Sequence, residues 1–125
     1  MRYNFTKIYF EREKMREKTI FERIVEGEIP SKKRLESDEF LAFDDINPKA
    51  PVHILVIPKA YYKDFQEFKP ELMAKMTSFI QELALLVGAD KSGYKLVTNC
   101  GAGAGQEVFH LHFHFLAGFK QKPDV

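Results

Sequence analysis

Residues 110–116 read His-Leu-His-Phe-His-Phe-Leu, so that three histidines alternate with apolar residues. Successive side chains of a β-strand point to opposite faces of a sheet. A strand in this segment would therefore bury Leu111, Phe113 and Phe115 on one face and place the histidines in a row on the other. The pattern predicts a strand with one buried face, and it concentrates three of the chain's 4 histidines on one short strip.

Three hypotheses account for His110, His112 and His114. The first is a solvated strand face, although three histidines in register are an unusual choice for a face that only needs solvation. The second is a metal site, because imidazole is a common ligand of zinc; Cys100 and His53 would be the remaining candidate ligands. The third is nucleophilic catalysis, because imidazole with a reference pKa of about 6.5 is mostly neutral at neutral pH and has a lone pair that can attack phosphorus.

A glycine-rich segment, 101–105, lies just before the histidines and favours chemistry on a phosphate. The complete pattern His-φ-His-φ-His-φ-φ, in which φ is apolar, resembles the histidine triad (HIT) superfamily and, within it, the Hint branch of nucleoside phosphoramidases. The resemblance covers residues 19–119, nearly the whole chain. Further segments resemble Hint segments in the same order: 19–21, 27–30, 41–48, 51–58, 96–99 and 105–108.

Local patterns predict two helices and a sheet. Thr19 and Glu22 form a capping box at the start of a helix that ends at Gly27. Apolar spacing predicts a second helix over 71–87, ended by glycine. The strands lack regular helical crossovers, which predicts an α+β fold with a mainly antiparallel sheet. Five strands are expected, over 33–37, 40–44, 52–57, 94–99 and 110–117.

The resemblance implies a HIT-like fold in which the sheets of two protomers are continuous across a homodimer. We expect the second helix to bury apolar residues against the other copy: Leu72, Met76, Phe79 and Leu83.

Length and composition fit a small enzyme. With 125 residues one domain is expected, divided into an N-terminal extension, 1–18, and a HIT domain, 19–125. A net charge of +1 gives no reason to expect nucleic acid or an anionic membrane as a partner. The lone Cys100 excludes an internal disulfide and fits a reducing compartment. No apolar run approaches the roughly 18 residues of a membrane span. We therefore expect a cytoplasmic protein.

The resemblance implies a role for each histidine. His112, in the centre of the triad, matches the family's nucleophile, whose outer ring nitrogen would attack the α-phosphorus of a purine nucleoside phosphoramidate. Its inner nitrogen would donate to a backbone carbonyl. The attack would give a covalent nucleotidyl-histidine, which water then hydrolyses. His114 would hold phosphate oxygens and help to pass a proton, with His110 and His53 supporting the network from either side. No metal and no cofactor are expected.

A nucleotide pocket is implied in the same way. Asp45 matches a carboxylate that accepts both ribose hydroxyls, a task suited to two oxygens rich in lone pairs. Asn99 would face the phosphate and its loop as a neutral donor. Backbone amides near the phosphate would come from Gly105, Gln106, Glu107 and Val108. The apolar slot for the purine would be formed by Ile20, Phe21, Ile24, Ile29, Phe43, Ile46 and Leu55.

Some positions differ from the eukaryotic Hint pattern and look more like bacterial members of the branch. Glu107 stands where those proteins usually carry serine, Phe109 replaces a tyrosine, and the chain has no tryptophan to close the site. Two other functions stay open at this point. One is hydrolysis of dinucleoside polyphosphates through the same intermediate, and the other is a nucleotide-binding regulatory protein with weak catalysis.

Overall fold

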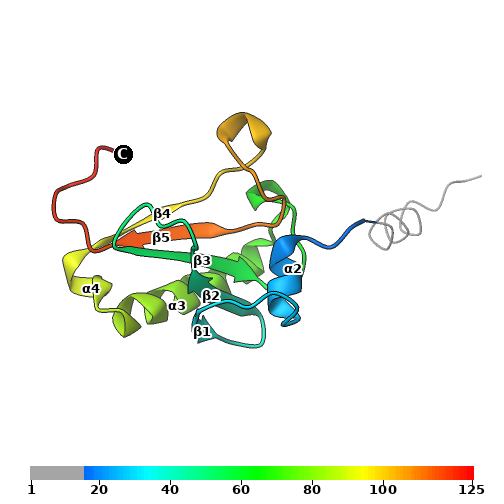
Figure 1. The fold of residues 1–125 in the computed structure, drawn as a ribbon, viewed down its shortest axis with the longest axis horizontal. Coiled ribbons are helices and arrows are strands. Elements are labelled where there is room, and N and C mark those ends of the chain that lie inside the picture. The colour runs from blue at the N-terminus through cyan, green and yellow to red at the C-terminus, as the bar shows by residue number, and fades with distance from the viewer. Residues whose placement is uncertain (1–15) are drawn as a thin grey trace, which may run out of the picture.

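The computed structural model describes residues 16–125. The predicted N-terminal extension falls mostly on residues 1–15, which lie outside the described residues, and its boundary stays a prediction. In chain order the elements are α2 (Ile20–Val25), β1 (Lys33–Glu36), β2 (Phe40–Asp44), β3 (Val52–Pro58), the 3-10 helix η1 (Phe65–Glu67), α3 (Pro70–Leu86), α4 (Ala89–Ser92), β4 (Tyr94–Val97), the 3-10 helix η2 (Ala102–Ala104) and β5 (Phe113–Ala117) (Figure 1).

The strands form one sheet in the order β1-β2-β3-β5-β4, and every neighbouring pair is antiparallel. The predicted α+β fold with a five-stranded antiparallel sheet is therefore confirmed. The two expected helices are α2 and α3, and the short α4 follows α3 directly. No helix in residues 16–125 combines the length and the apolar character that crossing a membrane requires.

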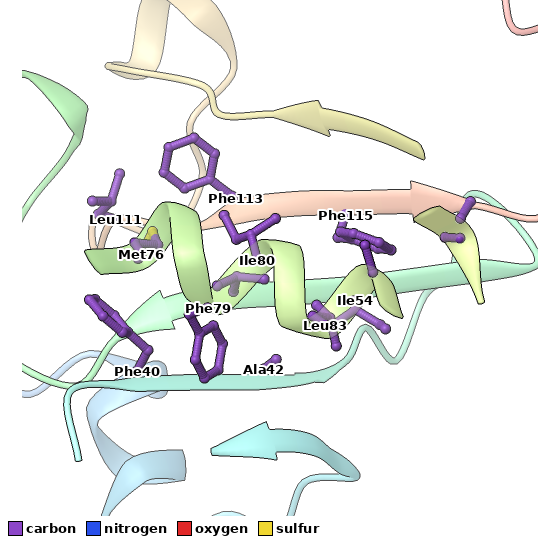
Figure 2. Packing of buried hydrophobic residues seen from close by; sticks show 14 of the residues in the cluster. Phe40, Ala42, Ile54, Met76, Phe79, Ile80, Leu83, Leu111, Phe113 and Phe115 are labelled. Atoms are coloured by element: carbon purple, nitrogen blue, oxygen red, sulfur yellow. The ribbon is translucent and has the colours of Figure 1, made fainter. Parts of the chain in front are cut away.

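Helix α3 covers one face of the sheet and forms the larger core with it (Figure 2). Phe113 and Phe115 of β5 point into this core, as the alternation in the sequence predicts. The expectation that the apolar residues of α3 meet a second copy is wrong, because the protomer's own sheet already covers them. The buried residues of this helix are Met76, Phe79, Ile80, Leu83 and Ala84, with Leu72 packed partly against them.

Helix α2 packs on the opposite face, where Phe21 and Ile24 join a second core with side chains of β2 and β3. The predicted capping box is present: the Glu22 amide donates to Thr19 Oγ1 at 3.1 Å, and the Thr19 amide donates to Glu22 Oε1 at 2.9 Å. Gly27 follows the helix with φ +83°, a left-handed conformation that glycine adopts at little cost. The buried side chains of this second core come from α2, β2 and β3, while residues of β4 and β5 line a cleft on the same face.

The last strand begins at Phe113, and the prediction that it starts at residue 110 is wrong. The backbone before it bonds elsewhere: the Leu111 amide donates to the Tyr62 carbonyl at 2.7 Å. The His112 carbonyl accepts from the Thr98 hydroxyl at 2.8 Å. This contact also lies just beyond the end of β4, which stops at Val97 instead of residue 99. The first two histidines of the triad therefore lie in an irregular segment that leads into β5.

Candidate active site

A cleft of about 1120 Å³ lies on the α2 face of the sheet. This volume is slightly above the roughly 300–1,000 Å³ that is typical of small-molecule sites. His110 and Gln106, both predicted to belong to the site, do not line it. The other predicted residues do: Ile20, Phe21, Ile24, Ile29, Phe43, Asp45, Ile46, His53, Leu55, Asn99, Gly105, Glu107, Val108, His112 and His114.

The ring of His112 is held in one tautomer by the backbone. Its Nδ1 lies 2.8 Å from the carbonyl oxygen of His110, and because a carbonyl only accepts, Nδ1 carries the proton. The lone pair of the ring is then on Nε2. Burial lowers the pKa of His112, so the ring is neutral at neutral pH. Phe21 packs edge-on against it, with 5.0 Å between the ring centroids. His112 thus offers an unprotonated nitrogen to the cleft that it lines.

A chain of hydrogen bonds fixes His53 and His114 in the other tautomer. The Lys49 amide donates to His53 Nδ1 at 2.9 Å, so the proton of the neutral His53 ring is on Nε2. His53 Nε2 in turn lies 2.9 Å from His114 Nδ1, which must accept. His114 therefore carries its proton on Nε2. Burial, followed by the neighbouring His112 and His53 rings, lowers the pKa of His114 to about 4. His114 is thus a neutral hydrogen-bond donor.

Asp45 lies at the edge of this chain. One carboxylate oxygen, Oδ1, accepts from the Asn47 amide at 2.8 Å, and Oδ2 lies 3.4 Å from His53 Nε2. Burial lowers the pKa of His53, so this contact joins a carboxylate to a neutral imidazole and is not an ion pair. The negative charge of Asp45 favours protonation of the nearby rings, but for each ring it is outweighed by burial.

Asp45, His53 and His114 bring ligand atoms within 4.8 Å of one another, a grouping that suits a metal ion. The tautomers oppose this use. His53 Nε2 carries the proton, and freeing it for a metal would move that proton to Nδ1, where the Lys49 amide already donates. Cys100, considered above as a further ligand, is exposed and does not belong to the group.

His110 lies behind the cleft and is fully buried. Its Nε2 lies 2.8 Å from the Pro58 carbonyl oxygen and therefore donates, which leaves Nδ1 to accept from the Thr19 hydroxyl at 2.9 Å. The rings of Phe21 and Tyr61 pack edge-on against it. Burial lowers the pKa of His110, so this ring is also neutral. A ring enclosed in this way supports the triad but does not contact a ligand.

The buried side chain of Gln106 hydrogen-bonds to the loop between β4 and β5 and holds it in place. Its Oε1 accepts from the Gly101 amide at 2.8 Å, while Nε2 donates to the carbonyls of Lys63 at 2.8 Å and Val108 at 3.0 Å. With 5% of its surface exposed, the side chain is almost enclosed. The prediction that Gln106 belongs to the nucleotide pocket is wrong, because its side chain is bonded to the loop from the side away from the cleft.

Not all of the loop amides are available to a phosphate. The amides of Gly105 and Gln106 donate to carbonyls within the loop, at 3.0 and 3.1 Å. The prediction that these two amides are free to bind a phosphate is therefore wrong. Asn99 Nδ2 also donates to this loop, at 2.7 Å from the Ala104 carbonyl oxygen. Within residues 16–125, the amides of Glu107 and Val108 are the two of the predicted four that have no hydrogen-bond acceptor.

Sequence reasoning missed the far end of the cleft, where Lys95 and Val97 of β4 lie beside Leu116 and His114 of β5. The alternation of β4 was visible in the sequence, but its place beside β5 was not. Two further lysines line the cleft, Lys32 and Lys49. The salt bridges in residues 16–125 use other lysines, namely Lys18, Lys33, Lys59 and Lys75. Further lining residues are Pro30, Ser31, Asp44 and Asn47.

Comparison with known proteins agrees with this arrangement. Residues 26–121 match the family model of the HIT domain. The chain is 59% identical over 101 residues to an uncharacterized HIT-like protein of Helicobacter pylori, a match that covers 81% of this chain and 97% of that protein. It is 47% identical over 110 residues to an uncharacterized 13.2 kDa HIT-like protein of Azospirillum brasilense, covering 85% and 90% of the two chains.

Solved structures show the same similarity. A HIT family hydrolase from Clostridium thermocellum superposes with a TM-score of 0.82 at 37% identity, covering 88% of this chain and 98% of the other. A hypothetical histidine triad nucleotide-binding protein from Sulfolobus tokodaii gives a TM-score of 0.74 at 32% identity, covering 83% and 72%. The sequence and fold comparisons agree, and the chain belongs to the HIT domain family.

Proposed function

We propose that this protein is a nucleotide hydrolase that cleaves the P–N bond of purine nucleoside phosphoramidates. The observation that carries the proposal is the state of His112, a neutral ring whose Nδ1 proton is held by the His110 carbonyl and whose Nε2 lone pair is free. Such a nitrogen is a good nucleophile towards phosphorus at neutral pH. A general role in nucleotide hydrolysis is also supported by the structural relatives, one called a hydrolase and another nucleotide-binding.

In the first step, His112 Nε2 attacks the α-phosphorus, and a P–Nε2 bond forms as the bond to the leaving amine breaks. The amine takes a proton from solvent in the cleft. His112 keeps its Nδ1 proton on the His110 carbonyl, which stabilises the positive charge that the ring acquires. His114 Nε2–H donates to a phosphate oxygen. With a pKa of about 4, the His114 ring is neutral at neutral pH and does not release its Nε2 proton as an acid, so His114 acts as a fixed donor and the expected part in passing a proton is not retained in this mechanism.

In the second step, water attacks the phosphorus of the nucleotidyl-histidine and the P–Nε2 bond breaks. The water proton passes to solvent, so that the complete cycle consumes one water and returns His112 to its starting tautomer. The free amides of Glu107 and Val108 would hold the phosphate oxygens through both steps. Two steps are easier than one because imidazole attacks phosphorus better than water does and also leaves readily.

The nucleoside would occupy the apolar side of the cleft. Phe21 and Ile24 of α2 pack with Phe43 and Leu55 of the sheet in the second core, and the same side chains line the cleft, which gives a purine ring an apolar surface to lie against. Ile46 is 91% exposed, so burying it on a bound base would add apolar contact that the free protein lacks. Asp45 stands at the end of this slot, where its carboxylate would accept the ribose hydroxyls.

Rapid-quench mass spectrometry tests the proposal. Wild-type protein mixed with an adenosine phosphoramidate should show a transient mass increase of one adenylyl group. His112→Ala should lose both the adduct and turnover, while AMP binding stays within about tenfold, a loss below about 1.4 kcal/mol. Persistence of the adduct in His112→Ala, or its absence from wild-type protein that turns over, would contradict the assignment.

A second candidate function has support in the lysines of the cleft, which line it together with the carboxylates of Asp44, Asp45 and Glu107. Lys32, Lys49 and Lys95 would attract a leaving group that carries negative charge, as the polyphosphate part of a dinucleoside polyphosphate does. The same attack by His112 serves both substrates. Comparing kcat/KM for an adenosine phosphoramidate and for diadenosine triphosphate separates the two functions. A large preference for the triphosphate would favour this second function over the first.

We also infer a homodimer and a cytoplasmic location. In residues 16–125, β4 is an edge strand, with Leu96 40% exposed, and Leu85 and Leu86 of α3 are 66% and 60% exposed. Pairing of this edge with a second copy would satisfy its backbone groups and cover apolar surface. Light scattering should give twice the chain mass of 14.6 kDa, and a monomer would contradict the inference. The free thiol of Cys100 fits a reducing compartment.

A further inference from the structure

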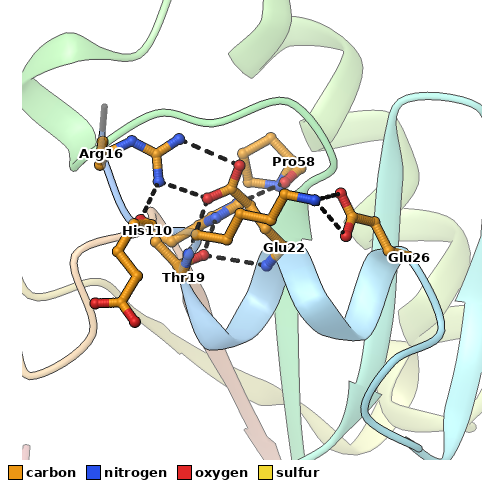
Figure 3. A network of polar contacts seen from close by, with 8 residues as sticks. Arg16, Thr19, Glu22, Glu26, Pro58 and His110 are labelled. Carbon is orange, nitrogen blue, oxygen red and sulfur yellow. Dashed lines mark hydrogen bonds and ion pairs between the residues drawn. The ribbon is translucent and has the colours of Figure 1, made fainter. Parts of the chain in front are cut away.

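Thr19 hydrogen-bonds two partners that are far apart in the sequence. As the residue that caps α2, its hydroxyl oxygen accepts from the Glu22 amide at 3.1 Å. The same hydroxyl donates its single proton to Nδ1 of the buried His110, 91 residues away, at 2.9 Å. One side chain thus connects the start of α2 to the first histidine of the triad (Figure 3).

His110 requires the hydrogen bond from the Thr19 hydroxyl. Its Nε2 donates to the Pro58 carbonyl, so Nδ1 must find a donor in a fully buried site. In residues 16–125 no buried side-chain nitrogen or oxygen lacks a hydrogen-bond partner. Without the Thr19 hydroxyl, this nitrogen would become such an atom, and a buried polar group without a partner is costly.

Charged groups hold Thr19 in this position. Arg16 forms two hydrogen bonds with the Glu22 carboxylate, at 2.6 and 3.2 Å, and Glu22 in turn accepts from the Thr19 amide. The hydrogen bond from Arg16 is the main reason that the pKa of Glu22 is lowered. The Arg16 guanidinium also lies over the ring of Tyr61, 3.5 Å from its centroid, and Tyr61 packs against His110. Through Arg16, the segment before α2 is thus held by Glu22 and by Tyr61, which packs against His110.

His110 links this network to the nucleophile through its own backbone. The ring, anchored at both nitrogens, fixes the position of residue 110, whose carbonyl oxygen accepts the Nδ1 proton of His112. That bond keeps the His112 lone pair on Nε2. We propose that Thr19 is a positioning residue for the nucleophile: its hydroxyl holds His110 in place, and His110 sets the tautomer and orientation of His112. This inference rests on the proposed function only for its kinetic consequence.

Three substitutions separate the hydroxyl's two tasks. Thr19→Ser keeps both the cap and the donated proton. Thr19→Asp keeps a good cap, since a carboxylate accepts from the helix amides, but has no proton to give to His110. Thr19→Val keeps the shape and loses both. Asp64→Ala is the matched control, because it removes another helix cap, to the Glu67 amide at 3.2 Å, that does not contact the triad.

The first measurement is the nitrogen-15 NMR spectrum of the histidine rings without any ligand. Wild-type and Thr19→Ser proteins should show His112 with its proton on Nδ1 and His110 with its proton on Nε2. In Thr19→Asp and Thr19→Val the His110 signals should shift, and His112 should populate both tautomers. Asp64→Ala should give the wild-type spectrum. Unchanged His112 ring nitrogens in both Thr19→Asp and Thr19→Val would overturn the inference, even where the His110 signals shift.

The second measurement is steady-state kinetics with an adenosine phosphoramidate. Thr19→Asp and Thr19→Val should lower kcat about tenfold, equal to about 1.4 kcal/mol, with little change in KM, because only the reacting nitrogen is displaced. Thr19→Ser should restore activity. If kcat falls in Thr19→Val but not in Thr19→Asp, Thr19 only caps the helix and does not position His110. If kcat falls in Thr19→Asp but not in Thr19→Val, the cause is the added charge. Either result overturns the inference. If wild-type protein has no turnover, the proposed function fails, while the spectra still decide the role of Thr19.

Discussion

Replacement of Gln106 by methionine tests how the loop beside the triad is held. Methionine has a similar length and fits a buried site, but it cannot make the three hydrogen bonds that Gln106 forms with Gly101, Lys63 and Val108. Each such bond contributes about 1 kcal/mol, and burial of the methionine side chain offsets part of the loss. We therefore expect Gln106→Met to lower the free energy of unfolding by about 2 to 3 kcal/mol.

Urea denaturation at fixed protein concentration measures this difference. With a slope of about 2 kcal/mol per molar, the midpoint should fall by about 1 M. Gln81→Met is the matched control, because Gln81 is exposed on α3 and its replacement should change the midpoint little. KM for an adenosine phosphoramidate should rise in Gln106→Met, since the amides of Glu107 and Val108 are displaced. Equal midpoints for the two variants would refute the role given to Gln106.

Three further predictions concern the chemistry of the cleft. The pKa of His114 is about 4 in the folded chain against 6.5 in the unfolded one, so the unfolded chain binds more protons between these values and stability should fall as the pH is lowered through this window. kcat/KM depends on the rings of the folded protein, and because burial lowers the pKa of both His112 and His114, its acid limb should lie below pH 6.5; an acid limb centred at pH 6.5 or above would contradict the assignment. Activity should survive dialysis against a chelator and be inhibited by added zinc, which would occupy the His112 lone pair; loss on chelation that stoichiometric zinc restores would favour a metal site. Glu107 is exposed and lines the cleft, so Glu107→Ser should raise kcat/KM for neutral or anionic leaving amines and lower it for cationic ones. Equal changes for leaving groups of matched pKa would mean that Glu107 only faces solvent.

The sequence was sufficient for those features that depend on local patterns. Alternation predicted that Phe113 and Phe115 are buried, and the spacing of Thr19 and Glu22 predicted a capping box. The chain order of strands and helices also predicted the antiparallel sheet. The buried alternation and the capping box depend on residues a few positions apart, whose geometry is nearly the same in any fold, whereas the sheet was predicted from the absence of helical crossovers between strands.

Features that depend on distant contacts could not be predicted in the same way. Alternation alone placed His110 beside His112, but the bond from the Leu111 amide to Tyr62 takes this segment out of the strand and turns His110 inwards. Gln106 was predicted to bind the ligand because it lies in the loop motif, but its side-chain amide hydrogen-bonds to backbone groups of Gly101, Lys63 and Val108. Lys95 reached the cleft only because β4 lies beside β5.

The tautomers of the four histidines have a consequence for molecules that bind in the cleft. Three main-chain groups, the Lys49 N–H and the carbonyls of His110 and Pro58, determine where every ring proton lies. Main-chain groups do not titrate, so the pattern stays the same as long as the rings are neutral and Thr19 holds His110 in place. A ligand then meets one acceptor, His112 Nε2, next to one donor, His114 Nε2–H. An inhibitor that presents a donor and an acceptor in matching order would bind this pair, whereas the reversed arrangement would be rejected.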